Sequence, residues 1–255
     1  MVKIKIREWD VVSSEELKLL LKPCCLHSER SCVCLYGLRP SQLPMPDGSD
    51  YSTLLQEPEV RSLVDVLPAR AEGYPWCLIY SSEEHGFSLS TLYRKMREWR
   101  EELSPTLLVL RETGGAVFGA VINCPLRTSE HFYGSGESFL FTFHQEHLRA
   151  DPPDPRRHAP AAHPPHPRHP ASEAPPPEEA EIRVFNWTGN NNFFVKASLD
   201  SLAVGSGGGH FGLWVDQGLC QGRTRTCDTF DNAPLCPQED FVIAAVEAWG
   251  FSVGL

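Results

Sequence analysis

Apolar residues recur at helical spacing in three stretches of the compact part of the chain. The first stretch ends before Pro68 and has the i, i+3, i+4, i+7 pattern at Val60, Leu63, Val64 and Leu67. The second covers residues 88–100, whose apolar face is made by Leu89, Leu92, Tyr93 and Met96. The third covers residues 237–249, where a proline beside acidic residues is typical of a helix N-terminus. The pattern predicts a helix in each stretch.

Short apolar runs bounded by turn residues predict strands in the rest of this part. Gly114 and Gly115 have the chemistry of a hairpin turn between two of the runs. The predicted strands cover residues 76–80, 107–110, 116–122, 138–143, 183–187, 193–195 and 211–215. Hairpin-linked strands with helices mostly at the two ends indicate an α+β fold, a two-sheet antiparallel β-sandwich flanked by helices.

Two segments do not share this pattern. Residues 1–50 are interpreted as an N-terminal extension, in which Ser13 and Glu16 have capping-box spacing and predict a short helix. Eleven of the 22 prolines lie between Arg149 and Glu181, together with four histidines, a composition that cannot form a packed core. We therefore predict one domain over residues 51–255, interrupted by a disordered His/Pro-rich insert at 147–181.

Charge and composition exclude several classes of protein. The formal net charge of −10 argues against binding to nucleic acid, because phosphate binding needs a basic face. No apolar run approaches the roughly 20 residues that span a bilayer, and no secretory apolar segment follows Met1. We expect no membrane insertion, a cytoplasmic monomer, and nine cysteines that are mostly reduced.

Seven short segments resemble, in order, the motifs of the TLDc domain family. They cover residues 69–76, 84–94, 132–141, 184–189, 205–216, 227–232 and 247–249. The resemblance implies a β-sandwich flanked by helices, a role in resistance to oxidative stress, and binding to the cytosolic sector of the vacuolar proton-pumping ATPase. Such a partner would also place the chain at the surface of endolysosomal membranes, and the sequence is compatible with both cytoplasmic and nuclear residence. The resemblance carries over no catalytic residue and no cofactor.

Binding residues are expected in loops held by the sheet, since loops on a rigid scaffold often carry function. The glycine-rich loop at 205–209 and the segment at 133–137 are the first candidates. The predicted helix around 241–249 is a second candidate contact, although its aromatic residues favour a place in the core. The candidate partner-binding residues are Tyr133, Gly134, Gly136, Glu137, Gly207, Gly208, Gly209 and Asp216.

The same residue types also permit other chemistry. The glycine loop could hold a phosphate, but no helix and no lysine follow it, so a turn with positive φ is favoured. Glu137 and Asp216 could act as acid and base if they shared a pocket, or they could cap backbone N–H groups or accept hydrogen bonds from Arg223. Four cysteines between residues 24 and 34 have poor spacing for zinc, so no metal site is predicted.

The alternative function is a redox-active thiol. Cys227 lies near Arg223 and Arg225 in the sequence, and these guanidinium groups could lower its pKa. A scavenging thiol of this kind would need to be exposed and to have a depressed pKa, and Cys220 and Cys236 could assist it.

Overall fold

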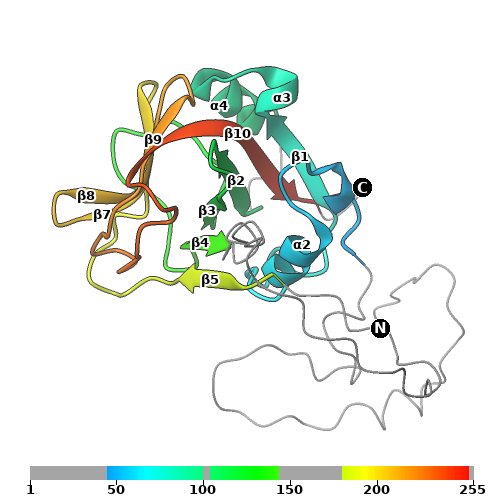
Figure 1. Cartoon of the computed structure of the whole chain (residues 1–255), viewed down its shortest axis with the longest axis horizontal. Coiled ribbons are helices and arrows are strands. Elements are labelled where there is room, and N and C mark those ends of the chain that lie inside the picture. Colours follow the sequence, from blue (N-terminus) through cyan, green and yellow to red (C-terminus); the bar gives the residue numbers. More distant parts are fainter. Residues whose placement is uncertain (1–44, 100–103, 144–179, 253–255) are drawn as a thin grey trace, which may run out of the picture. The chain divides into compact units, whose positions relative to one another are not determined.

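The computed structural model describes residues 45–99, 104–143 and 180–252. The predicted helix near Ser13, the cysteines between residues 24 and 34, and the His/Pro-rich insert up to residue 179 lie outside the described residues. The described part is an α+β structure with ten antiparallel strands and three short helices (Figure 1). This agrees with the predicted α+β class and with the predicted antiparallel pairing of the strands.

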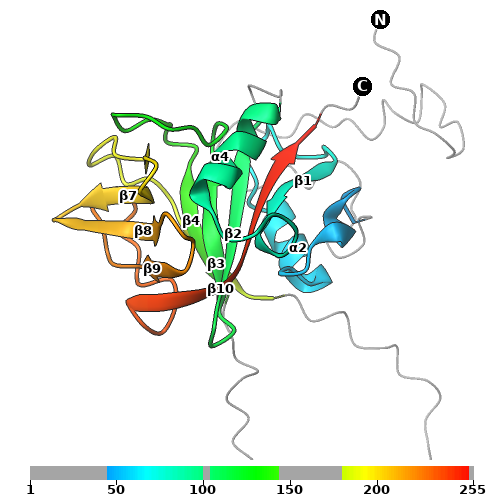
Figure 2. The ribbon, with the colours of Figure 1, turned by 90° about the horizontal axis from the view of Figure 1, so that it is seen from above.

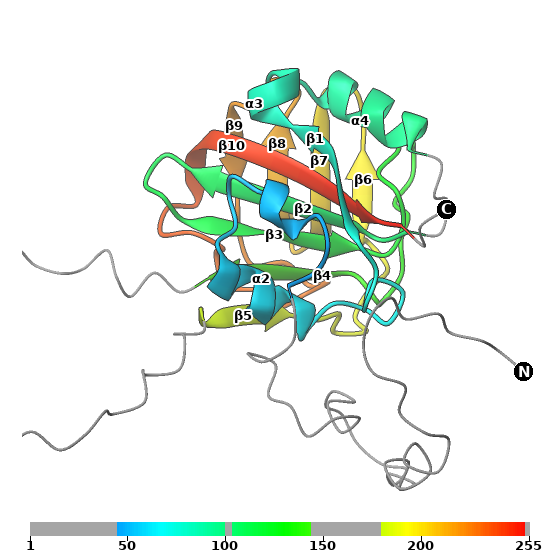
Figure 3. The ribbon, with the colours of Figure 1, turned by 90° about the vertical axis from the view of Figure 1, so that its right-hand side faces the viewer.

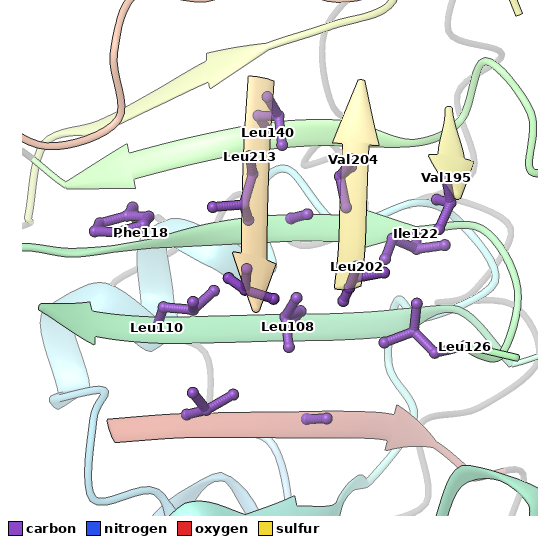
Figure 4. Close-up of a cluster of buried hydrophobic side chains, with 14 of the residues drawn as sticks. Leu108, Leu110, Phe118, Ile122, Leu126, Leu140, Val195, Leu202, Val204 and Leu213 are labelled. Carbon is purple, nitrogen blue, oxygen red and sulfur yellow. The ribbon is translucent and has the colours of Figure 1, made fainter. Parts of the chain in front are cut away.

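The ten strands form one sheet: nine follow a hydrogen-bonded path in the order β5-β4-β3-β2-β10-β9-β8-β7-β6, and β1 lies off this path, paired with β10. Their bounds are β1 Trp76–Ser81, β2 Thr106–Glu112, β3 Val117–Ile122, β4 Phe139–Phe143, β5 Ile182–Phe185, β6 Val195–Ala197, β7 Ser201–Gly207, β8 His210–Asp216, β9 Gln221–Arg223 and β10 Asp240–Phe251. The sheet curls, so that β7 and β8 cross over β2, β3 and β4 (Figure 4). The strands therefore face one another across a core, but as one continuous sheet rather than as two separate ones.

The helix predicted over residues 237–249 is wrong, because this segment forms the long strand β10. Phe241 and Ile243 are buried while Val242 and Ala244 are exposed, which is the period of two expected for a strand. The alanines and Glu247 favour a helix by intrinsic propensity. That propensity is overridden because β10 pairs with β1, β2 and β9, and its backbone groups are satisfied only in the sheet.

The described residues include three short helices. They are α2 (Glu57–Val64), α3 (Ser82–His85) and α4 (Leu89–Glu98), with a 3₁₀ turn η3 (Ser49–Tyr51) before them. The α4 helix begins after Ser88, whose hydroxyl accepts a hydrogen bond from Thr91 N, and its predicted apolar face is buried. None of the helices in the described ranges has the length and hydropathy needed to cross a bilayer.

Two apolar clusters lie on the two faces of β2, β3 and β4. The first fills the space under β7 and β8 (Figure 4) and includes Leu108, Leu110, Phe118, Ile122, Leu126, Leu140, Val195, Leu202, Val204 and Leu213. The second lies under α2 and includes Leu63, Leu107, Val109, Phe141 and Trp249. Figure 2 shows β7–β9 on one side of β2–β4 and α2 on the other. Alternate side chains of β2 thus enter opposite clusters, which explains its uninterrupted apolar sequence.

The path of the strands determines which loops lie at the same end of the domain. In Figure 3, α3 and α4 lie at the end of the domain opposite β5. Leu89 N, at the start of α4, donates to Gln217 O, just after β8. The glycine-rich turn that joins β7 to β8 is therefore at the far end of the β7–β8 hairpin from α4.

Candidate functional site

The glycine-rich segment is a tight hairpin turn between β7 and β8. Gly208 and Gly209 both have positive φ, 62° and 83°, the pattern of a two-residue hairpin turn. Gly205 also has positive φ, 75°, and a Cβ there would lie 2.6 Å from the Phe230 ring. A strand follows the turn, as predicted. The glycines of the turn are therefore needed for positive φ angles and close packing rather than for a phosphate loop.

A buried hydroxyl joins this turn to two neighbouring loops. Thr229 is fully buried, and its Oγ1 accepts a hydrogen bond from Ser206 N at 2.9 Å. The same atom lies 2.8 Å from Asn191 Oδ1 and 2.7 Å from Ser206 O. Thr188 N donates to Thr229 O at 3.0 Å. The turn and the segments around residues 188–191 and 229 therefore hold one another in place.

The segment at 132–137 lies against the same loops. Tyr133 and Val195 exchange both backbone hydrogen bonds, at 2.9 and 3.0 Å. A Cβ on Gly136 would overlap the Trp187 ring, and one on Gly134 would lie 3.0 Å from Phe194 Cβ. Two of the predicted glycines are therefore required because aromatic side chains cover their backbone. We call residues 132–137, 187–194 and 206–209 together the aromatic loop surface.

Two exposed aromatic side chains on this surface were missed by the sequence analysis. Trp187 is 40% exposed and Phe193 is 45% exposed, although both are large and apolar. Phe193 contacts Phe132, with ring centroids 4.9 Å apart. Both residues were assigned to strands, but β5 ends at Phe185 and β6 begins at Val195. The run of threonine, glycine and three asparagines between them was the available signal for a loop.

The two candidate carboxylates lie in different places. Glu137 pairs with Arg70 at 3.1 Å on the aromatic loop surface. Asp216 ends β8 on the α4 side, where its Oδ1 accepts from Cys220 N at 2.8 Å and Gln221 N at 3.0 Å. The seven residues of β8 span roughly 20 Å, which separates Asp216 from the glycine turn. Asp216 therefore caps a turn, does not belong to the aromatic loop surface, and does not share an acid–base site with Glu137.

Comparison with known sequences decides the family. The sequence profile of the TLDc domain matches residues 48–159 and 177–252, which is well over half of the chain. The chain belongs to the TLDc domain family. Between its two parts the TLDc match leaves out residues 160–176, which belong to the His/Pro-rich insert, and it includes every residue of the aromatic loop surface.

Relatives of this TLDc domain are regions of much longer proteins. It is 35% identical over 245 residues to nuclear receptor coactivator 7 of Homo sapiens, covering 96% of this chain and 21% of that protein. It is 37% identical over 250 residues to oxidation resistance protein 1 of Xenopus tropicalis, covering 96% and 24%. The human oxidation resistance protein 1 is 36% identical over 263 residues, with 96% and 26% covered. The chain thus spans about a quarter of these relatives.

Cys227 of this TLDc domain does not have the properties required of a redox thiol. It is 2% exposed, its Sγ donates to Asn232 Oδ1 at 3.3 Å, and burial raises its pKa above the ordinary value. Arg225 pairs with Glu239 at 2.7 Å and Arg223 pairs with Asp240. The arginines therefore neutralise carboxylates instead of activating the thiol.

We expect Cys227 to react with N-ethylmaleimide at least about 100-fold more slowly than the exposed Cys220, since a buried thiol reacts only when the structure opens. Peptide-resolved mass spectrometry of native protein over time measures both rates, and urea-unfolded protein serves as the control in which they converge. Equal rates in the native protein would contradict this burial and would restore the thiol hypothesis.

Proposed function

We propose that this TLDc domain is a non-catalytic protein-interaction domain that binds the cytosolic sector of the vacuolar proton-pumping ATPase through the aromatic loop surface. The observation that carries the proposal is the pair of exposed aromatic side chains, Trp187 and Phe193, on loops tied together by the buried hydroxyl of Thr229. Aromatic anchors of this kind supply much of the binding energy of protein interfaces.

Rigidity of the loops supports a binding role. An aromatic side chain that is already held in place loses little conformational entropy when a partner covers it. Trp187 Nε1 donates to Asn191 O at 2.7 Å, and its ring contacts Phe194 at a centroid distance of 5.5 Å. The exposed edge of this indole is therefore presented in one orientation. Beside it, the Glu137–Arg70 pair supplies charges of both signs at the rim.

The choice of partner rests on the family. Vacuolar ATPase binding is a property that the TLDc resemblance implies, and two relatives carry the name oxidation resistance protein 1. We therefore assign to this chain a contribution to oxidative-stress resistance that works through its partner, at the cytoplasmic face of the membranes that hold the pump. The separation of Glu137 from Asp216 and the burial of Cys227 favour this binding role over catalysis by those residues.

A direct binding measurement tests this proposal. Purified cytosolic sector of the vacuolar ATPase is titrated onto immobilised domain by biolayer interferometry, with and without nucleotide. Phe193→Ala should weaken binding by about 10-fold or more, because its exposed ring would be buried in the interface. Phe87→Ala is the matched control, since Phe87 is 43% exposed but lies between α3 and α4, at the other end of the β7–β8 hairpin.

The results test the identity of the partner and the location of the binding surface separately. Loss of binding with Phe193→Ala and not with Phe87→Ala supports both the partner and the aromatic loop surface. An equal loss in both variants, or no loss in either, would move the interface elsewhere on the domain. Absence of binding by the wild type at tens of micromolar would reject the ATPase as partner, provided that thermal melting shows the domain to be folded.

A further inference from the structure

The outer face of β8, β9 and β10 carries a groove of about 630 Å³. Cross-strand pairs place Trp214 opposite Arg223 and Arg223 opposite Asp240, so these three side chains lie on one face of the sheet. The chain neighbours of Trp214 are Leu213 and Val215, which are buried in the first apolar cluster, whereas Trp214 is half-buried. The groove is therefore on the solvent side of this half of the sheet.

Apolar side chains and hydrogen-bond donors line this groove. Phe211 is half-buried, and Val242 is 52% exposed although it is apolar. Within the described ranges, Nε1 of Trp214 makes no hydrogen bond. Arg223 donates to Asp240 from Nε, so its Nη groups can still donate to a ligand. The groove therefore suits a ligand that is apolar and offers acceptors.

A polyproline II segment has this chemistry. It has no internal hydrogen bonds, so its carbonyl oxygens can accept from a partner, and its prolines have no N–H that would need an acceptor. Proline-rich segments dock in aromatic-lined grooves of other proteins. Three residues make one turn of this helix, so prolines spaced by three lie on one side. The His/Pro-rich insert has this spacing at Pro164, Pro167 and Pro170.

The two ends of the insert lie near the groove. The insert leaves the sheet after Phe143 and returns at Ile182, and these two residues are paired across β4 and β5. The neighbouring Thr142 donates from Oγ1 to Leu235 O at 2.6 Å. Asp240, at the rim, follows Leu235 by five residues. Five residues span at most about 18 Å, so the insert starts within roughly 25 Å of the groove.

The insert is long enough to cover this distance. Twenty residues lie between Phe143 and Pro164, and eleven lie between Pro170 and Ile182. Extended chain spans about 3.3 Å per residue, so even the shorter arm reaches about 35 Å. Because both arms are tethered to the domain, the effective concentration of the prolines is on the order of 1 mM. A groove with an intrinsic Kd of about 0.1 mM would then be occupied in most molecules.

We infer that the groove lined by Phe211, Trp214 and Val242 binds residues 164–170 of the same chain as a polyproline II helix. The proline rings pack against the apolar side chains, and Trp214 Nε1 and the Nη groups of Arg223 donate to carbonyl oxygens of the segment. The groove shares no residue with the aromatic loop surface, so the contact is independent of the proposed ATPase binding. The segment falls within residues 160–176, so the TLDc profile does not account for it.

Hydrogen exchange of the tryptophan indoles in the full chain tests the contact. Loss of the three prolines should make the Trp214 indole proton exchange with water about 10-fold faster, because the bound segment protects it in most molecules. This variant is Pro164→Ala, Pro167→Ala and Pro170→Ala together. The control variant replaces three prolines that are not spaced by three, Pro175, Pro176 and Pro177. Equal exchange rates in the wild type and the first variant, or an equal change in both variants, would overturn the inference.

Variants of the groove test the contact from the other side. Val242→Lys changes an exposed side chain, and Trp214→Phe keeps an aromatic ring but removes the N–H. Trypsin should cleave the wild-type chain after Arg168, inside the bound segment, about 10-fold more slowly than after Arg157, outside it. Both variants should remove most of this difference, and thermal melting checks that each is folded. A difference that persists in both folded variants would contradict binding in the groove.

A synthetic peptide of residues 160–172 distinguishes this occupant from a proline-rich segment of another protein. In calorimetric titrations the peptide should bind about 10-fold more tightly to the variant without Pro164, Pro167 and Pro170 than to the wild type, because the insert competes for the groove. Equal affinity for the two proteins would show that the insert does not occupy the groove. No binding to either protein at millimolar concentration would reject a polyproline site altogether.

Discussion

Replacement of Glu247 by alanine should lower the free energy of unfolding by about 3–5 kcal/mol. Glu247 lies in the middle of β10 and is 1% exposed. Its Oε1 accepts hydrogen bonds from Thr53 N at 2.7 Å and Thr53 Oγ1 at 3.0 Å. Its Oε2 accepts from Ser52 Oγ at 2.7 Å and Trp249 Nε1 at 3.1 Å. The alanine variant removes the acceptor of all four donors; Trp249 Nε1 is buried and is left unpaired, Ser52 is half-buried, and the donors of the exposed Thr53 can turn to water.

The size of this effect follows from the cost of unpaired buried donors. Each such donor costs about 1–3 kcal/mol, and part of that cost is relieved by relaxation of the 52–53 segment. Glu247→Gln should lose roughly half as much, since its amide keeps one acceptor oxygen but presents N–H groups to the donors. Urea denaturation followed by tryptophan fluorescence measures both variants.

The matched control for Glu247 is another glutamate whose hydrogen bonds are exposed. Glu98 accepts from Arg94 at 2.9 Å at the surface of α4, and Glu98→Ala should cost less than about 0.5 kcal/mol. A loss below 1 kcal/mol for Glu247→Ala would show that the segment around Ser52 and Thr53 is not tied to β10 in solution.

Alanine at Gly119 should cost about 3 kcal/mol or more, because β3 has no room for a side chain there. Gly119 pairs with Val109 of β2 and with Phe141 of β4. A Cβ on Gly119 would overlap the carbonyl oxygen of Leu108 and would lie 3.0 Å from Cζ of Phe141. The backbone oxygen cannot move away without opening the β2–β3 ladder, so the strain falls on the centre of the sheet.

Gly189→Ala separates this steric effect from the effect of backbone conformation. Gly119 does not have positive φ, whereas Gly189 has φ of 83° and nothing within 4 Å of an added Cβ. Gly189→Ala should therefore cost only about 1 kcal/mol, through strain in the left-handed region alone. The denaturant midpoints of the two variants give the comparison, and similar losses would contradict the close approach of β2 and β3.

Gly119 and Glu247 both belong to the scaffold that holds the loops of the aromatic loop surface together. Gly119 lies in β3, between β2 and β4, and the segment at 132–137 leads directly into β4. Glu247 fixes the segment before α2 to the strand that joins the two halves of the sheet. Changes at these residues should reduce partner binding only through loss of folded protein, whereas Phe193→Ala should reduce it at unchanged stability.

Local sequence patterns were sufficient for much of the fold. The apolar faces of α2 and α4 follow from a spacing of three and four residues, since side chains at that spacing lie on one side of any helix. The strands β2, β3 and β4 follow from apolar runs separated by turn residues. The positive φ of the glycine turn follows as well, because only residues without a Cβ adopt it readily. Each of these features depends on residues close together in the chain.

The candidate site was only partly predictable, because much of it depends on residues that are far apart in the chain. Tyr133, Gly134 and Gly136 were identified, but the rings that cover these glycines, those of Phe194 and Trp187, come from residues about 50 to 60 positions later in the chain. The apolar runs that contain Trp187 and Phe193 predict strands. The exposure of these two side chains was not predictable, because it depends on where β5 ends and where β6 begins. The positions of Asp216 and Cys227 relative to the other candidates depend on the path of β8 and on packing around Asn232.

By itself, the sequence determined the α+β class, the TLDc family, the amphipathic faces of α2 and α4 and the conformation of the glycine turn. Only the tertiary structure decided that residues 240–251 form a strand, that ten strands make one curled sheet, and that Cys227 is buried. The physical reason is that a strand is stabilised by partners distant in sequence, as β10 is by β1, β2 and β9. A local pattern carries no information on which distant segment will pair with it or cover it.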